Sequence, residues 1–409
     1  MSVESRSATG AGGLESGSSG SYFPCLDAYR AIGMTMVLLI HVEFSTLASD
    51  KGPAGPFLAR MDLGLELFFV LSGFLIYRPF VLASLTDGGG IATWRFLRRR
   101  LLRIFPGYWF ALTMVVILFG VQMDSIGDVI VYYGLLQSFD AGRLFGGIEQ
   151  SWSLMTELCF YVMLPIFAAI LWQFTKQRTA EARARAALVG CAVLYLIGFL
   201  FRCYIVYADP SWQRQAVLWL PGHLDLFAIG MAFAVVSARV SRGATCPGPI
   251  RYLSAHPWIA WALAAVVWIS LSRTAPPDTP GVFGTEYIVR LFLYGVIAAF
   301  MLTPAFFGDQ TATNLRKFLS SRVMVYLGTV SLGFYLWHLD ILDQIREWME
   351  YEPFRGNFLW LVVATFALSL VAASVSYYAI ERPFLRLKDR PVSSLWRQPS
   401  RFWAREASR

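Results

Sequence analysis

Charged residues are scarce in this chain. Asp, Glu, Lys and Arg together make up 15% of its 409 residues, whereas hydrophobic residues make up 56%. A soluble domain of ordinary composition has about a quarter charged residues. This shortage excludes a soluble globular protein, and the sequence predicts an integral membrane protein.

Cysteine and histidine are also few. The five cysteines show no C-x-x-C or other metal-ligand spacing, which indicates neither a disulfide framework nor a zinc site. The four histidines are scattered, and no metal site is expected. The net charge of +8 comes from basic residues between apolar runs, so it indicates membrane topology, and no nucleic acid partner is expected.

Ten apolar runs approach the ~20 residues that span a membrane. The predicted fold is all-α, a polytopic membrane protein of about ten transmembrane helices. A shorter apolar piece, 129–139, is interpreted as a helix in a loop. The expected spans are 26–48, 63–86, 101–123, 153–174, 187–207, 216–238, 257–272, 284–307, 324–346 and 357–381.

The loop charges predict the orientation. Arg and Lys gather after the even-numbered spans, whereas acidic residues are commoner after the odd-numbered ones. This bias places both termini in the cytoplasm and the protein in the inner (plasma) membrane. Residues 1–21 are Gly/Ser-rich and predict a disordered tail, with no signal peptide recognised before the first span. Residues 387–409 are basic and aromatic, typical either of a tail on the anionic leaflet or of a disordered tail.

The first span carries two residues that a membrane helix usually avoids, Arg30 and His41. Eleven positions is three helical turns, so both side chains return to nearly the same face, about 16 Å apart along the axis. Intramembrane ionisable residues are costly and indicate a functional site. The alternatives are an Arg30 that anchors the helix at the headgroups and a His41 that only packs.

The spacing of Arg30 and His41 resembles the R-x10-H signature of the acyltransferase 3 family of integral membrane acyltransferases. Five further blocks resemble that family in the same order, and together they cover 22–386. They are GLELFFVLSGFLI (64–76), RRRLLRIFPGYW (98–109), SWSLMTELCFYVMLP (151–165), LGFYLWHLDI (332–341) and IERPFLR (380–386).

The resemblance implies a set of site residues. The expected catalytic residues are His41 and Glu157. The residues expected to bind the acyl-CoA donor are Arg30, Arg100 and Arg103. The residues expected to bind substrate are Glu66, Trp152 and His338. The chain departs from the family at Leu158, where a second acid is common, and at Leu339, where Pro or Gln is usual. Longer members carry an appended hydrolase-like domain, and this chain is expected to act without one.

Other polar residues leave alternatives open. Glu157 is expected to orient His41, to hold an acceptor hydroxyl or to pair with an arginine. Glu43 is expected at the outer interface, as are His223 and Asp225, although these two would also suit the acceptor side. His256 is interpreted as structural, and the basic run at 98–103 is also typical of a topology signal.

The expected activity is transfer of an acyl group, most simply acetyl, from cytoplasmic acyl-CoA to a hydroxyl of a carbohydrate, a cell-envelope glycolipid or a glycosylated metabolite. Arginines would bind the phosphates of the donor, and His41 would act as general base. Membrane lipid is a further partner, and homo-oligomerisation is left open. The few lysines beside many arginines hint at a GC-rich bacterium. A proton-coupled transporter is the alternative, against which the chain shows no internal repeat.

Overall fold

The computed structural model describes residues 23–86, 91–274 and 283–387, and every regular element in these ranges is helical. The N-terminal half contains α1 (Pro24–Thr46), α2 (Gly55–Leu58), α3 (Leu63–Ser84), α4 (Thr93–Phe119), α5 (Ile126–Tyr133), α6 (Trp152–Thr175) and α7 (Ala180–Ala208). The C-terminal half contains α8 (Gln213–Ala216), α9 (Leu220–Val240), α10 (Gly248–Ala255), α11 (Pro257–Thr274), α12 (Thr285–Phe306), α13 (Asn314–Leu319), α14 (Arg322–Thr329), α15 (Ser331–Trp348), α16 (Phe358–Ser376) and α17 (Arg382–Leu387). Short 3-10 turns lie at Ala48–Asp50, Gln137–Phe139 and Glu149–Ser151, and a π-helical turn lies at Tyr377–Glu381.

The expected polytopic all-α fold is confirmed. Within the described ranges, eight helices are long and apolar enough to cross a membrane, or ten if each of two bent pairs counts as one span. The short apolar piece after the third span forms α5, a helix of 8 residues, and is too short to cross. The helix of the third expected span is α4, which begins earlier than expected, at Thr93. The basic run at 98–103 therefore lies inside α4.

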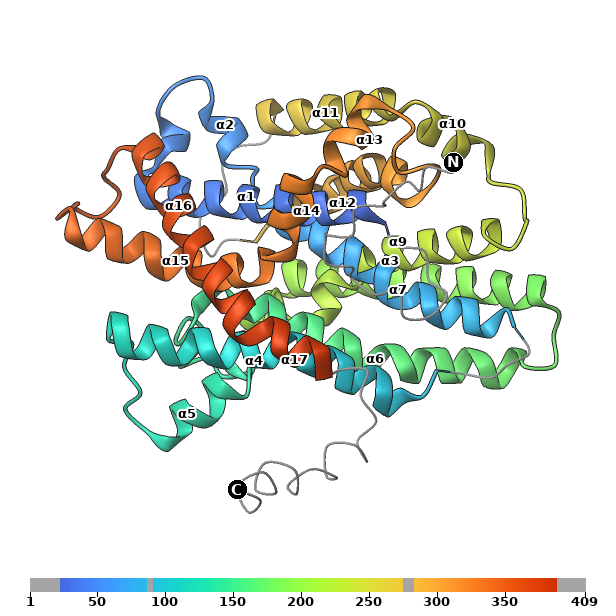
Figure 1. The fold of residues 1–409 in the computed structure, drawn as a ribbon, viewed down its shortest axis with the longest axis horizontal. Helices are drawn as coiled ribbons and strands as arrows, with labels where there is room; N and C mark the ends of the chain where they lie inside the picture. Colours follow the sequence, from blue (N-terminus) through green and yellow to red (C-terminus); the bar gives the residue numbers. More distant parts are fainter. Residues whose placement is uncertain (1–22, 87–90, 275–282, 388–409) are drawn as a thin grey trace, which may run out of the picture.

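Figure 1 shows that the connections gather at two opposite ends of the bundle. The segments between α1 and α3, between α4 and α6, and between α15 and α16 lie at one end. The connections from α6 to α7 and from α9 to α10 lie at the other end. This alternation agrees with the even and odd loops of the sequence, whose charges predict that the second end is cytoplasmic.

One expected span is broken, and another follows a sharp bend. The helix axes of α10 and α11 differ by 100°, and those of α14 and α15 by 66°. The seventh span is therefore preceded by a separate short helix, and the ninth is divided at Val330. A Cβ at Gly328 would overlap the backbone oxygen of Asp27, so this glycine lets α14 lie directly against α1. The bend then sets the start of α15 beside the first span.

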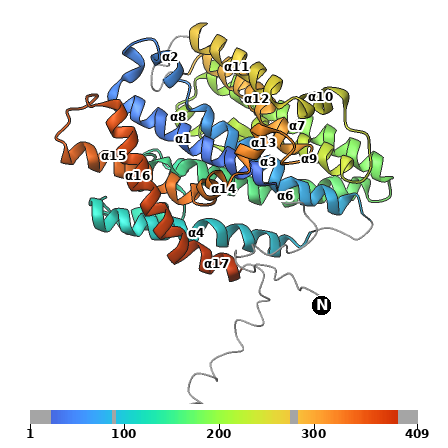
Figure 2. The same cartoon turned by 45° about the horizontal axis from the view of Figure 1, so that its top comes forward.

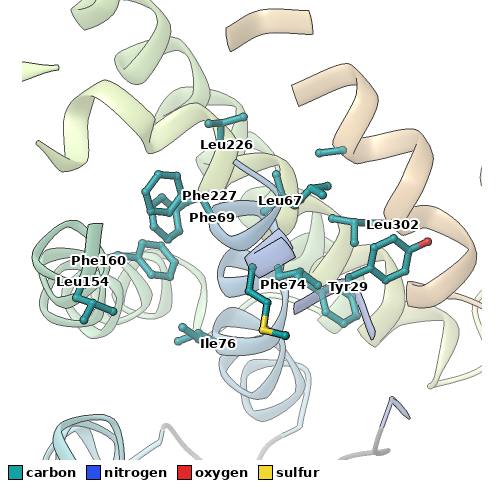
Figure 3. Close-up of a cluster of buried hydrophobic side chains, with 14 of the residues drawn as sticks. Tyr29, Leu67, Phe69, Phe74, Ile76, Leu154, Phe160, Leu226, Phe227 and Leu302 are labelled. Atoms are coloured by element: carbon teal, nitrogen blue, oxygen red, sulfur yellow. The ribbon is translucent and has the colours of Figure 1, made fainter. Parts of the chain in front are cut away.

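Aromatic rings from three helices fill the core. Phe160 of α6 stacks on Phe227 of α9 with ring centroids 4.2 Å apart, and Phe69 of α3 lies 4.9 Å from the same Phe227 ring. Figure 3 shows these rings together, with Leu226 beside them. Offset and tilted pairs of this kind stabilise a core beyond their buried area. The site described below is built on this rigid centre.

Glycines allow α3 and α9 to cross closely. A Cβ at Gly73 would overlap the backbone oxygen of Phe227, and a Cβ at Gly230 would overlap that of Val70. Small residues at such crossings let two membrane helices approach backbone to backbone. The close crossing fixes α9 against the helix that supplies one wall of the candidate site.

Replacing Gly230 with alanine is expected to force α3 and α9 apart and lower stability by about 1–3 kcal/mol, the usual range for overpacking. The measurement is the thermal midpoint of the purified protein in detergent. Gly248→Ala is the matched control, because a Cβ there meets open space. An unchanged midpoint for Gly230→Ala would contradict the close crossing.

Candidate functional site

A cavity of about 100 Å³, with a lining of both polar and apolar side chains, lies where α1, α3, α4, α6 and α15 meet. Its polar lining comes from all five helices, and leucine, isoleucine and phenylalanine side chains complete the walls. The polar lining residues are Arg30, Ser72, Arg100, Arg103, Ser153, Glu157, Tyr161, Ser331 and Tyr335. The three arginines predicted to bind the donor therefore line one cavity.

The arginines are held by different contacts. Arg30 donates to Asp27 across 2.6 Å, one turn earlier on α1. It also interacts electrostatically with Arg103 and Glu157. The Arg100 guanidinium lies over the rings of Phe96 and Tyr161, 5.6 Å from each centroid. Three cations facing one space create a positive potential that favours an anionic ligand.

Glu157 is the carboxylate of this cavity. It accepts a hydrogen bond of 2.7 Å from the Ser72 hydroxyl and interacts electrostatically with Arg30 and Arg100. The contact that holds Glu157 is its hydrogen bond to Ser72, and the arginines act on its carboxylate at longer range. The partner that orients His41 is a different residue.

That partner is His338 of α15. Its Nε2 lies 2.9 Å from Nδ1 of His41, and its Nδ1 lies 2.8 Å from the backbone oxygen of Tyr335. His338 is fully buried, whereas His41 is half-buried. Both ring nitrogens of His338 are thus occupied inside the protein, which favours a positioning role over the predicted contact with substrate.

These hydrogen bonds determine which ring nitrogen carries the proton in each neutral histidine. A backbone carbonyl only accepts, so Nδ1 of His338 carries its proton and Nε2 accepts. Nδ1 of His41 then donates to that nitrogen. This leaves Nε2 of His41 with a lone pair, which is the form that can take a proton from a substrate.

Tyr335 connects the histidine pair with the cavity. Its backbone oxygen accepts from His338 and from the Gln150 amide, while its ring lines the cavity. Its hydroxyl donates to the backbone oxygen of Gln150 at 2.7 Å and lies 2.7 Å from the Ser153 hydroxyl. One residue therefore contacts both the histidine pair and the cavity wall.

Glu66 and Trp152 lie in a second polar cluster. Glu66 lies 3.5 Å from Nδ1 of His223, and the Trp152 ring is 5.7 Å from the imidazole. Phe69 contacts this imidazole at 4.8 Å and also lines the cavity, so its ring lies between the two sites. The histidine is 3% exposed, and its ring nitrogens make no hydrogen bond within the described residues.

The interface positions expected for His223 and Asp225 are wrong, because both side chains are buried. Asp225 accepts two hydrogen bonds from Arg202 of α7, at 2.6 and 2.9 Å. Arg202 also donates to the backbone oxygen of Gly222. Sequence could not reveal this, since the arginine that compensates the acid is on another helix.

Two smaller expectations have mixed outcomes. Glu43 is 6% exposed and accepts from the backbone N–H of Ser49, so it caps the turn after α1 and is not an interface residue. His256 ends α10 and packs on Tyr252, which agrees with a structural role. The predicted tails at 1–21 and 387–409 lie outside the described residues, except for Leu387, which ends α17. No group of three or more His, Cys, Asp or Glu suited to a metal occurs in the described ranges.

A family model described as an acyltransferase domain matches residues 23–378. The chain belongs to the acyltransferase 3 family. This confirms the resemblance carried by the six motif blocks, and it confirms the prediction of an acyltransferase at the level of the family. No solved structure matches the chain.

Curated relatives of this acyltransferase domain come from bacteria. It is 25% identical over 382 residues to the putative peptidoglycan O-acetyltransferase YrhL of Bacillus subtilis, covering 88% of this chain and 55% of the relative. It is 24% identical over 379 residues to the peptidoglycan O-acetyltransferase OatA of Listeria monocytogenes, covering 88% and 56%. The chain thus spans about half the length of these relatives.

Sequence reasoning missed several polar residues of the acyltransferase domain. Ser72, Tyr161 and Tyr335 lie inside motif blocks that carry the resemblance, but no role follows from their position. The signal that was available is a hydroxyl in an otherwise apolar run. Such a group needs a partner inside the bundle.

Proposed function

We propose that this protein is a bacterial plasma-membrane O-acyltransferase that moves an acyl group, most simply acetyl, from cytoplasmic acyl-CoA to a hydroxyl of a cell-envelope carbohydrate, a glycolipid or a glycosylated metabolite. One observation carries the proposal. A single helix, α1, holds Arg30 in a basic cavity and, about 16 Å further along its axis, His41 with an available Nε2.

The cavity chemistry supports an anionic donor. Acyl-CoA carries phosphates at one end and a thioester at the other, and planar guanidinium groups bind phosphate oxygens in pairs. Arg30, Arg100 and Arg103 would bind the nucleotide end. An extended pantetheine arm has a reach comparable with the rise from Arg30 to His41. Glu157 would hold the arginines in place through its charge and its bond to Ser72.

His41 supplies the proton transfer. Its Nε2 takes the proton of the acceptor hydroxyl while the oxygen attacks the carbonyl carbon of the thioester. The carbon–sulfur bond then breaks, and the proton passes from His41 to the thiolate. The products are the ester and CoA. His338 would keep His41 in the required tautomer, since its own Nδ1 is bound to the Tyr335 carbonyl.

The second cluster supports an acceptor site. Trp152 offers an aromatic face. Oε2 of Glu66 and both ring nitrogens of His223 are buried and have no hydrogen-bond partner among the described residues. A sugar would stack on the ring and offer its hydroxyl groups to these polar atoms. The names of the relatives support a cell-envelope carbohydrate, with peptidoglycan as the first acceptor to test.

The experiment is CoA release by purified protein in nanodiscs with acetyl-CoA, measured with a thiol-reactive dye. Soluble peptidoglycan fragments and, separately, an envelope lipid extract serve as acceptors. Release that rises with an acceptor, together with acetyl ester found on that acceptor, supports the proposal. The absence of release with every acceptor and acyl-CoA tested, while the protein moves a solute across vesicles without acyl-CoA, contradicts it and favours a transporter.

A further inference from the structure

The donor cavity, which is the space lined by the three arginines, follows α3 and α6 through the bundle. Both helices begin at the end that holds the α1–α3 and α4–α6 connections, so they run in the same direction (Figure 1). The hydrogen bond between Ser72 and Glu157 sets their register. Tyr161 lies one turn beyond Glu157, and the Arg100 guanidinium lies over its ring. Arg100 is therefore on the side that the loop charges predict to be cytoplasmic.

The opposite end of the donor cavity is apolar. Three lining residues of α3 lie one to two turns before Ser72, namely Leu65, Phe68 and Phe69. Leu154 of α6 lies at the same level, one turn before the glutamate that binds Ser72. An apolar end in a space with a charged opposite side suits a ligand that is anionic at one end and apolar at the other.

This apolar end adjoins the histidine pair. The Tyr335 hydroxyl lies 2.7 Å from the hydroxyl of Ser153, the residue before Leu154. The backbone oxygen of Tyr335 accepts from His338, which in turn binds His41. A donor held by the arginines at its nucleotide end, with its thioester at the histidines, would therefore place its acyl group in the apolar end.

Phe69 is the wall that closes this end toward α9. The residue is 2% exposed, and its ring centroid lies 4.8 Å from that of His223 and 4.9 Å from that of Phe227. Phe227 is itself stacked on Phe160, and Figure 3 shows the Phe69 ring against these two rings. A close-packed interior of this kind yields little to an inserted group. The Phe69 ring therefore sets a firm limit to the cavity.

Phe68 closes the same end toward α1. A Cβ at Gly33 would lie 2.8 Å from the Phe68 ring, so this ring lies directly against the backbone of the first span. Figures 1 and 2 both show α3 beside α1 and α9. Each of the two phenylalanines thus has a helix behind it.

We infer that Phe69 is a specificity-determining residue, whose ring limits the acyl group of the donor to a short chain. This inference rests on the proposed function, since it uses the donor and the orientation proposed there. An acetyl group fits before the ring, whereas a longer chain meets it. His223 lies on the far side of the ring, so removal of the ring extends the apolar end toward the second polar cluster.

Equilibrium binding of three ligands to the protein in nanodiscs tests this role, by competition with radiolabelled acetyl-CoA. The ligands are CoA, acetyl-CoA and hexanoyl-CoA. We expect the wild type to bind hexanoyl-CoA at least about tenfold more weakly than acetyl-CoA, because even one misfitting methylene in a pocket has an effect of that order. Phe69→Ala is expected to remove this difference by binding hexanoyl-CoA more tightly. Its affinity for CoA is expected to stay at the wild-type value, because the arginines are unchanged.

The matched control is Phe74→Ala on the same helix. It removes the same ring from a buried position outside the cavity lining, where Phe74 stacks on Phe306 with centroids 3.9 Å apart. The ratio of hexanoyl-CoA to acetyl-CoA affinity is expected to remain that of the wild type. A variant that only loosens the fold binds all three ligands more weakly, so tighter binding of the longer chain is specific to an enlarged acyl pocket. Phe69→Leu tests the role if the alanine variant fails to fold.

Equal affinity of the wild type for acetyl-CoA and hexanoyl-CoA would overturn the inference without any variant. An unchanged affinity ratio in Phe69→Ala, with CoA binding intact, would overturn it as well. Both results leave the proposed function standing. A wild-type protein that binds neither acyl-CoA contradicts the proposed function itself, and this inference fails with it.

Discussion

Replacing His41 with alanine is expected to lower acceptor-dependent CoA release by about 10²–10⁴-fold, the usual contribution of a general base. The reason is the available Nε2 of His41, left by the bond of its Nδ1 to His338. The measurement is kcat with saturating acetyl-CoA. His256→Ala is the control, because that ring packs on Tyr252 at the end of α10 and is expected to leave turnover unchanged. Near-normal turnover by His41→Ala would remove the base from the mechanism.

His338 offers a graded test of the same mechanism. Leucine at this position leaves Nδ1 of His41 without its acceptor, so either tautomer can form and turnover falls. Glutamine supplies an acceptor and a donor on one side chain, so it is expected to recover part of that loss. The two variants are compared by kcat across pH, because His41 must be deprotonated to act as the base and its titration therefore sets the acidic limb of the pH–rate profile. Identical profiles for both variants would rule out a positioning role.

The Asp225→Ala variant is expected to lose about 3–5 kcal/mol of stability, the cost of leaving one charge of a buried pair uncompensated. Arg202 is fully buried and donates two hydrogen bonds to Asp225. The measurement is unfolding in mixed micelles, followed by tryptophan fluorescence. This change acts through α7 and α9, away from the donor cavity, so acetyl-CoA affinity of the folded fraction is expected to persist.

Two further variants test whether the stability lost by Asp225→Ala comes from the buried ion pair. Arg355→Ala removes an ion pair whose side chains are 76% and 74% exposed, and an exposed pair of this kind contributes about 0–1 kcal/mol. Replacing Arg202 and Asp225 together with Met and Leu removes both charges and is expected to recover much of the stability lost by Asp225→Ala. An Asp225→Ala protein as stable as the wild type would contradict the buried pair.

Local rules predicted what lies along one helix. Apolar runs are a property of neighbouring residues, so they located the membrane helices, and helical geometry placed Arg30 and His41 on one face. The motif blocks then selected Arg100, Arg103 and Glu157, which the structure brings into one cavity with Arg30. Helix boundaries were less accurate, because α4 continues through its basic run.

Long-range partners could not be predicted in this way. His41 and His338 are separated by 297 positions, and the bend before α15 brings α15 to α1. The pairing of Glu66 with His223 depends on the close glycine crossing of α3 and α9. Glu43, His223 and Asp225 looked like interface residues because each lies near the end of a span. Their burial depends on neighbouring helices whose positions a single sequence does not contain.

Equilibrium binding of acetyl-CoA to the purified wild type, Arg30→Ala and His41→Ala separates donor binding from proton transfer. We assign the nucleotide end of the donor to the arginine cavity and proton transfer to the histidine pair. Arg30→Ala is therefore expected to weaken binding by about tenfold or more, as for a lost charged hydrogen bond. His41→Ala is expected to bind as the wild type does. Wild-type affinity in Arg30→Ala, or no acyl-CoA binding by the wild type, would contradict this assignment.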